Sequence, residues 1–63
     1  MFKPASELIA GDVWREGPDM VRMMRTEPYP VPSIVRIIVA KLSDETEMTL
    51  DFYRVNKRDV KES

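Results

Sequence analysis

Closely spaced turn signals constrain this chain more than any other feature of its sequence. Clusters of glycine, proline and small polar residues recur at residues 11–12, 16–19, 27–32, 43–46 and 56–59. Proline and glycine in a helix interior cost about 3 and 1 kcal/mol respectively, relative to alanine. Only the region around residues 34–55 leaves room for a good helix, so the pattern predicts short strands joined by turns.

The region from residue 33 to residue 53 predicts an antiparallel hairpin. Met48, Leu50 and Phe52 recur at every second position, the period of a half-buried strand, and we expect them to face the core. Residues 33–42 are dense in β-branched side chains, which favour strands. A short polar turn joins the two segments. An amphipathic helix over residues 34–42 is the alternative.

Two shorter strands are expected before this hairpin. Residues 12–15 should pair with residues 19–26 across the Gly17-Pro18 turn, with Val21 and Met23 on one face. Residues 1–10 are expected to form a lead-in with a single helical turn over residues 4–9, capped by Ser6. Residues 56–63 are expected to form a short last strand or a frayed tail.

Five short strands in 63 residues predict one domain, residues 1–63, that curls into a small antiparallel barrel. The segment 5–14 reads Ala-Ser-Glu-Leu-Ile-Ala-Gly-Asp-Val-Trp. It resembles the Leu-x-x-Gly-Asp lead into the first strand of SH3-like barrels, in which Gly11 would permit a tight turn, Asp12 would bond nearby amides and Leu8 would plug the barrel end. In layout the chain resembles small bacterial and bacteriophage proteins of this kind. The resemblance implies an all-β, five-stranded SH3-like barrel.

The residue inventory argues against catalysis. The chain has no histidine and no cysteine, and its only glycines are Gly11 and Gly17. It therefore lacks the usual general base, the thiol nucleophile, Cys/His metal ligands and a glycine-rich phosphate loop. The acidic cluster at residues 44–47 is interpreted as a solvated turn. We expect no enzyme activity, no cofactor and no bound metal.

No apolar run approaches the ~20 residues of a membrane span, since the longest covers residues 37–40. We therefore expect a cytoplasmic protein with no membrane partner.

Arg36 interrupts the most apolar segment of the chain. If Val35, Ile37 and Val39 face the core, the outward row comprises Ile34, Arg36, Ile38, Ala40 and Leu42. Such an apolar outward row is typical of an interaction surface, where arginine is also enriched. The alternative is that the arginine stem covers its apolar neighbours while its head reaches water.

These features predict a protein-interaction module, with a larger protein or further copies of itself as partner. The resemblance adds the variant of a phage or accessory protein that modulates a larger protein. An outward Trp14 would belong to this surface, although a core position is the alternative. The candidate contacts are Trp14, Arg22, Met24, Arg25, Tyr29, Ile34, Arg36 and Ile38.

Nucleic-acid binding is the alternative function. Small barrels bind nucleic acids through basic grooves and stacking aromatics, and Arg22, Arg25, Arg36, Arg54, Lys57 and Arg58 would supply the charge. The pI of about 5.3 opposes this function, because nucleic-acid-binding domains are usually basic.

Overall fold

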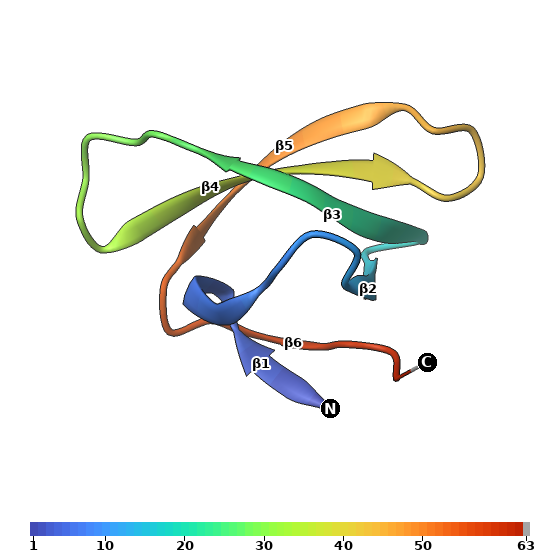
Figure 1. Ribbon diagram of the computed structural model, residues 1–63, viewed down its shortest axis with the longest axis horizontal. Helices are drawn as coiled ribbons and strands as arrows, with labels where there is room; N and C mark the ends of the chain where they lie inside the picture. The colour runs from blue at the N-terminus through green and yellow to red at the C-terminus, as the bar shows by residue number, and fades with distance from the viewer. Residues whose placement is uncertain (63) are drawn as a thin grey trace.

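The computed structural model describes residues 1–62, which form an all-β fold (Figure 1). The elements in chain order are β1 (Phe2–Pro4), the 3-10 turn η1 (Ala5–Glu7), β2 (Val13–Glu16), β3 (Asp19–Glu27), β4 (Ile34–Lys41), β5 (Glu47–Tyr53) and β6 (Lys57–Asp59). The all-β class predicted from the sequence is confirmed. The predicted count of five strands is wrong, because the described residues form six strands and the extra one, β1, lies in the expected lead-in.

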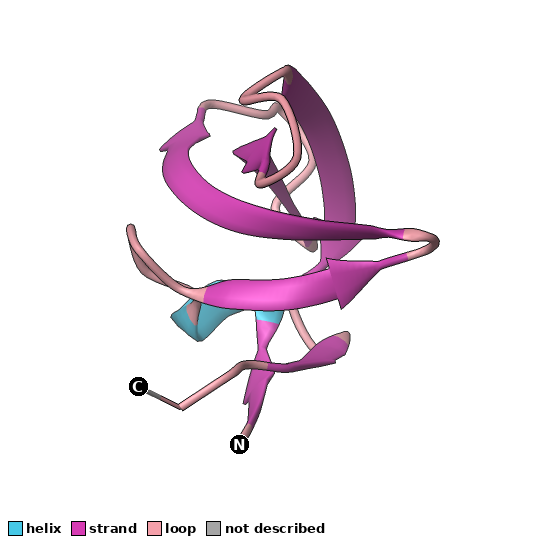
Figure 2. Ribbon diagram, turned by 90° about the vertical axis from the view of Figure 1, so that its right-hand side faces the viewer, coloured by secondary structure: helices cyan, strands magenta, loops and turns pink. Residues whose placement is uncertain are grey.

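The strands form two antiparallel sheets. One sheet has the order β2-β3-β4-β5, and the other pairs β1 with β6. Figure 2 shows that the larger sheet is strongly curled, with η1 and the two short strands below it. A bulge between Met23 and Arg25, where β3 changes register against β4, contributes to this curl, because bulges bend and twist a strand.

The β4–β5 hairpin agrees with the sequence pattern. Its ladder runs from Ile34 opposite Tyr53 to Ala40 opposite Glu47, so the alternative helix over residues 34–42 is wrong. Alternation places Met48, Leu50 and Phe52 against the core, as predicted, but of the three only Phe52 is buried and the other two are half-buried. The side of the curled sheet formed by β5 is therefore less covered than the rest.

The Leu-x-x-Gly-Asp segment behaves as its chemistry suggests. Gly11 takes a φ of 95°, a left-handed conformation that glycine adopts without steric cost. Asp12 accepts a hydrogen bond from the Ile9 amide at 3.0 Å and another from Lys3 Nζ at 3.0 Å. Leu8 is 5% exposed and belongs to the core. These interactions fix the path of the chain into β2.

The core lies between the curled sheet and the β1–β6 pair. Its fully buried large side chains are Trp14, Val21, Ile37 and Val39, and Leu8, Met23, Phe52 and Val60 surround them. Trp14 and Val21 face each other across the β2–β3 ladder, so they share the inner face. Burial of these side chains is the main favourable contribution to folding.

The two ends of the chain pack together and bond to each other. Residues 57–59 of the tail form β6, and Val60 directly after this strand is buried, with its amide donating to the Met1 carbonyl at 2.7 Å. Ser63, part of the predicted tail, lies outside the described residues. The helical turn expected over residues 4–9 is present as η1, but Pro4 occupies its N-cap position and Ser6 makes no cap. No helix within residues 1–62 is both long and apolar enough to cross a membrane.

Candidate interaction surface

Ion pairs cover part of the outer face of the four-stranded sheet, over strands β3, β4 and β5. Ile38 is 5% exposed and Ala40 is 2% exposed, although neither belongs to the core cluster. In the ladder Arg25 lies opposite Ile38, and its guanidinium approaches Glu47 to 3.8 Å across β4. Arg22 lies opposite Ala40 and is paired with Glu45. The apolar row expected to be open is therefore covered at this end by arginine stems.

At the other end of the same face, Arg36 is held by two interactions. Its Nε donates to Asp51 Oδ1 at 2.8 Å and its Nη2 donates to Asp51 Oδ2 at 2.9 Å, a two-pronged pair. The Tyr29 ring lies 4.7 Å from the guanidinium carbon, within cation–π range. The hydrogen bonds from Arg36 lower the pKa of Asp51. The guanidinium is thus fixed in position with a charged partner and an aromatic cover.

Five residues together form what we term the aromatic–arginine patch: Tyr29, Ile34, Arg36, Asp51 and Tyr53. Ile34 lies opposite Tyr53 in the β4–β5 ladder, on the same face as the Arg36–Asp51 pair. Tyr53 is 60% exposed. Tyr29 reaches this face from the proline-rich β3–β4 loop. The patch contains tyrosine and arginine side chains, which are enriched in protein-binding hot spots, beside one aliphatic side chain.

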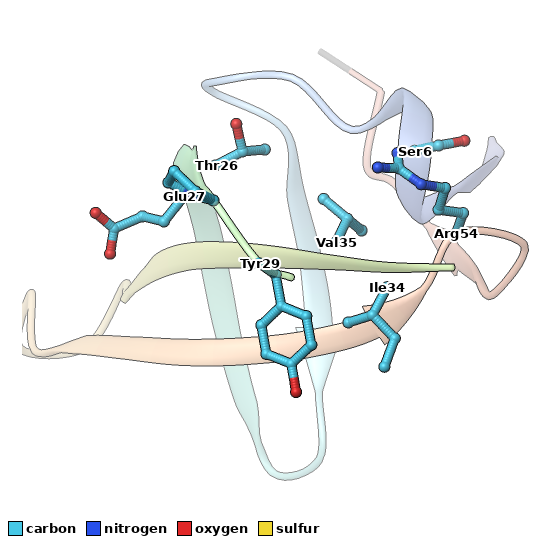
Figure 3. A pocket seen from close by; sticks show the side chains of 8 residues that line it. Ser6, Thr26, Glu27, Tyr29, Ile34, Val35 and Arg54 are labelled. Atoms are coloured by element: carbon cyan, nitrogen blue, oxygen red, sulfur yellow. The ribbon is translucent and has the colours of Figure 1, made fainter. Parts of the chain in front are cut away.

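An open groove of about 700 Å³ adjoins the patch (Figure 3). Figure 3 shows Tyr29 and Ile34 on one side of β4, and Val35, Ser6 and Arg54 on the other. Arg54 closes one border, since its Nε donates to the Pro32 carbonyl at 2.6 Å. The lining residues are Ser6, Thr26, Glu27, Pro28, Tyr29, Ile34, Val35 and Arg54. The lining combines apolar and polar side chains, both of which occur in protein-binding surfaces.

The structure brings some of the predicted contact residues together and separates others. Tyr29, Ile34 and Arg36 meet in the aromatic–arginine patch. Arg22, Met24 and Arg25 lie farther along β3, where Met24 is the half-buried residue at the bulge.

Trp14 and Ile38 require correction as surface contacts. Trp14 is 0% exposed, because its strand is in register with Val21 on the inner face. Ile38 is covered by the ion pairs described above. Sequence reasoning did not include Tyr53 and Arg54 among the candidate protein contacts, although Tyr53 lies in the patch and Arg54 lines the groove. The alternation of residues 48–53 was the available signal, since it places Tyr53 on the outer face.

A second arginine, Arg58 on β6, has a similar environment. Arg58 donates to both carboxylate oxygens of Glu16, at 2.8 and 3.2 Å, and its guanidinium carbon lies 4.3 Å from the centre of the Phe52 ring. Glu16 also accepts the Trp14 Nε1–H at 2.9 Å. Burial raises the pKa of Glu16, but the hydrogen bonds from Arg58 and Trp14 and the Arg58 charge outweigh burial and lower it overall. This arrangement joins β6 to β2 and to the core.

Most of the basic side chains suggested for nucleic-acid contact have acidic partners. Arg22, Arg25, Arg36 and Arg58 are paired with Glu45, Glu47, Asp51 and Glu16 respectively. Within residues 1–62, no three acidic side chains gather closely enough to hold a metal ion. The surface is therefore one of neutralised charge with exposed aromatic groups.

No known protein family matches the sequence, and no curated protein is significantly similar to it.

Proposed function

We propose that this protein is an interaction module of the SH3-like half-barrel type, which binds a partner protein through the aromatic–arginine patch and the adjoining groove. The observation that carries the proposal is the fixed position of the Arg36 guanidinium. Two hydrogen bonds to Asp51 and a cation–π contact with the Tyr29 ring hold the Arg36 side chain in place. The side chain lies beside Ile34 and the exposed Tyr53. The curl of the sheet and the Leu-x-x-Gly-Asp turn support the barrel type.

Preorganisation of the patch favours tight binding. An unrestrained surface arginine loses side-chain entropy when it is immobilised, at about 0.5–1.5 kcal/mol per side chain. Arg36 is already immobilised by Asp51 and Tyr29. A partner that covers the patch with an apolar side chain would bury the tyrosine rings and Ile34 without separating the ion pair.

Charge neutralisation favours a protein partner over a nucleic acid. Binding to phosphates requires cations that are free to displace counterions. Four of the six basic residues considered for that role are already in ion pairs. In the variant suggested by the resemblance, the partner is a larger protein that this domain modulates.

Affinity capture with matched surface variants tests the proposal. The immobilised protein is exposed to extract from its native host before and after nuclease treatment, and captured proteins are identified by mass spectrometry. We expect a protein retained by the wild type to be lost with Tyr29→Ser, which removes the aromatic cover of Arg36. Phe2→Ser is the matched control, because Phe2 is a 69% exposed aromatic outside the patch.

Two outcomes would contradict the proposed function. One is a partner retained equally by wild type, Tyr29→Ser and Phe2→Ser, which would place binding elsewhere. The other is capture that disappears after nuclease treatment and weakens steeply with salt, which would indicate nucleic-acid binding.

A further inference from the structure

The outer edge of β5 is a second surface of interest, which shares Asp51 and Tyr53 with the aromatic–arginine patch but uses their backbone groups and not their side chains. β5 ends the sheet order β2-β3-β4-β5 and is bonded to β4 on one side. The opposite end of the sheet is partly covered, because the Lys61 amide donates to the Val13 carbonyl of β2 at 2.7 Å. Within residues 1–62, no strand pairs with the outer edge of β5. Unpaired strand edges are ready templates for another strand.

The hydrogen-bond pattern identifies which groups of β5 face outward. Lys41 donates to the Thr46 carbonyl and Arg54 donates to the Ser33 carbonyl, at the two ends of the β4–β5 ladder. Antiparallel bonding alternates, so the even-numbered residues of β5 bond β4 and the odd-numbered ones direct their N–H and C=O groups away from it. The outward groups belong to Glu47, Thr49, Asp51 and Tyr53.

The inner face beside this edge is incompletely covered. Met48 and Leu50 point toward the core but are only half-buried, whereas Phe52 on the same strand is 7% exposed. A strand added at the edge would extend the sheet and cover their open sides. Burial of apolar area contributes about 25 cal/mol per Å². The site therefore offers both backbone bonds and apolar contact.

We propose that β5 pairs with β5 of a second copy of this chain in antiparallel orientation, with Leu50 of the two copies directly opposite. The backbone groups of Thr49 then bond those of Asp51 in the second copy, and the reverse. Met48 lies opposite Phe52 of the second copy on the inner face. The full length of β5, Glu47–Tyr53, takes part in this register.

Charge selects this register over its neighbours. With Leu50 opposite Leu50, Glu47 faces Tyr53 and Asp51 faces Thr49, so no like charges are directly opposed. A shift by two residues places Glu47 opposite Asp51 in one direction and Asp51 opposite Asp51 in the other, and opposed like charges destabilise a sheet.

Single-cysteine variants test the register, because the chain has no cysteine of its own. In Leu50→Cys the two sulfur-bearing residues form a non-hydrogen-bonded pair with Cα atoms about 4.5 Å apart, within the disulfide range of about 4.4–6.8 Å. In Met48→Cys, the matched half-buried control, they lie four residues apart along the strands, about 13 Å. We expect mild oxidation to convert Leu50→Cys to a covalent dimer and to leave Met48→Cys uncrosslinked.

Sedimentation tests the edge itself. We expect the wild type to show a concentration-dependent shift from the 7.3 kDa chain mass to twice that mass. Thr49→Pro removes an outward N–H and leaves the bonds to β4, so it should lose the dimer, whereas Thr49→Val should keep it. Circular dichroism verifies that both variants fold.

Three results would overturn the proposal. In the first, the wild type stays monomeric up to about 1 mM, which corresponds to an association free energy no stronger than about −4 kcal/mol. In the second, the Thr49→Pro variant folds and still forms the dimer. In the third, Met48→Cys crosslinks as fast as Leu50→Cys. If the protein is a monomer and its outward β5 amides become protected from hydrogen exchange only when an extended peptide is added, the edge binds a foreign strand and not a second copy.

Discussion

Arg36 and Arg58 occupy similar chemical environments in two different regions of the molecule. Each guanidinium donates two hydrogen bonds to one carboxylate and stacks on one aromatic ring. The Arg58 side chain is 26% exposed and that of Glu16 is 23% exposed, against 37% and 35% for Arg36 and Asp51. The Arg58 cluster joins elements far apart in the chain, whereas the Arg36 cluster joins neighbouring strands of one hairpin. We infer that the first stabilises the fold and the second shapes a surface.

The largest expected effect comes from removing the carboxylate of the inner cluster. Glu16→Ala leaves the buried Trp14 Nε1–H and the Arg58 guanidinium without their acceptor. We expect a loss of about 2 kcal/mol in the free energy of unfolding, the magnitude for hydrogen bonds to charged groups. Urea titration at fixed protein concentration, followed by the fluorescence of Trp14, measures it. Glu7→Ala, at an exposed site, is the control, and an equal loss in both variants would refute the structural role of Glu16.

The next largest expected effect is on the loss of folding stability at acid pH. The folded protein holds the pKa of Glu16 below its usual value of about 4.5, so this carboxylate stabilises the fold above that pH. The stabilisation is lost as pH falls through the lower pKa of the folded state. Glu16→Gln should therefore flatten the decline of wild-type stability below about pH 4.5. Urea midpoints measured across this pH range provide the test, and an unchanged acid dependence would contradict it.

Asp51 sharpens the comparison under the same conditions. Its pKa is also lowered, by hydrogen bonds from Arg36, so its contribution is likewise lost as pH falls. Because this ion pair is more exposed, salt should screen its contribution more strongly. We expect Asp51→Asn to change the acid dependence at low salt and to match the wild type at high salt, whereas the effect of Glu16→Gln should persist. Equal salt sensitivity of the two variants would contradict the distinction between a shielded Glu16–Arg58 pair and an exposed Asp51–Arg36 pair.

The smallest expected effects come from replacing each arginine by lysine, which keeps the charge but removes the planar fork. Arg58→Lys should lower the free energy of unfolding by about 1 kcal/mol, through lost stacking and a lost second hydrogen bond. Arg36→Lys should leave the urea midpoint nearly unchanged and weaken capture of the partner protein. A reversed order of the two midpoints would contradict the assignment of Arg58 to the fold and Arg36 to the surface.

The two predictions that erred in the candidate site share a physical cause. Trp14 follows Val13 in a short strand, and alternation alone does not decide which of the two faces inward. Pairing with Val21 decides it, because opposite residues in a ladder share a face. Ile38 lies on the outer face as expected, yet side chains from β3 and β5 cover it. Neither contact is local in sequence.

β1 was missed for a related reason. Phe2–Pro4 is short and ends in proline, so it carries little strand signal of its own. It becomes a strand through its pairing with β6, at the other end of the chain. The Gly11-Asp12 turn was predictable, in contrast, because its chemistry is contained within a few residues.

The sequence by itself determined the all-β class, the β4–β5 hairpin and the inward positions of Met48, Leu50 and Phe52, since turn residues and side-chain alternation act locally. The tertiary structure decided which strand edge is covered, which way Trp14 faces, and which of two chemically similar arginines lies beside the core. Those outcomes depend on long-range register and on the meeting of the two chain ends, which no local pattern encodes.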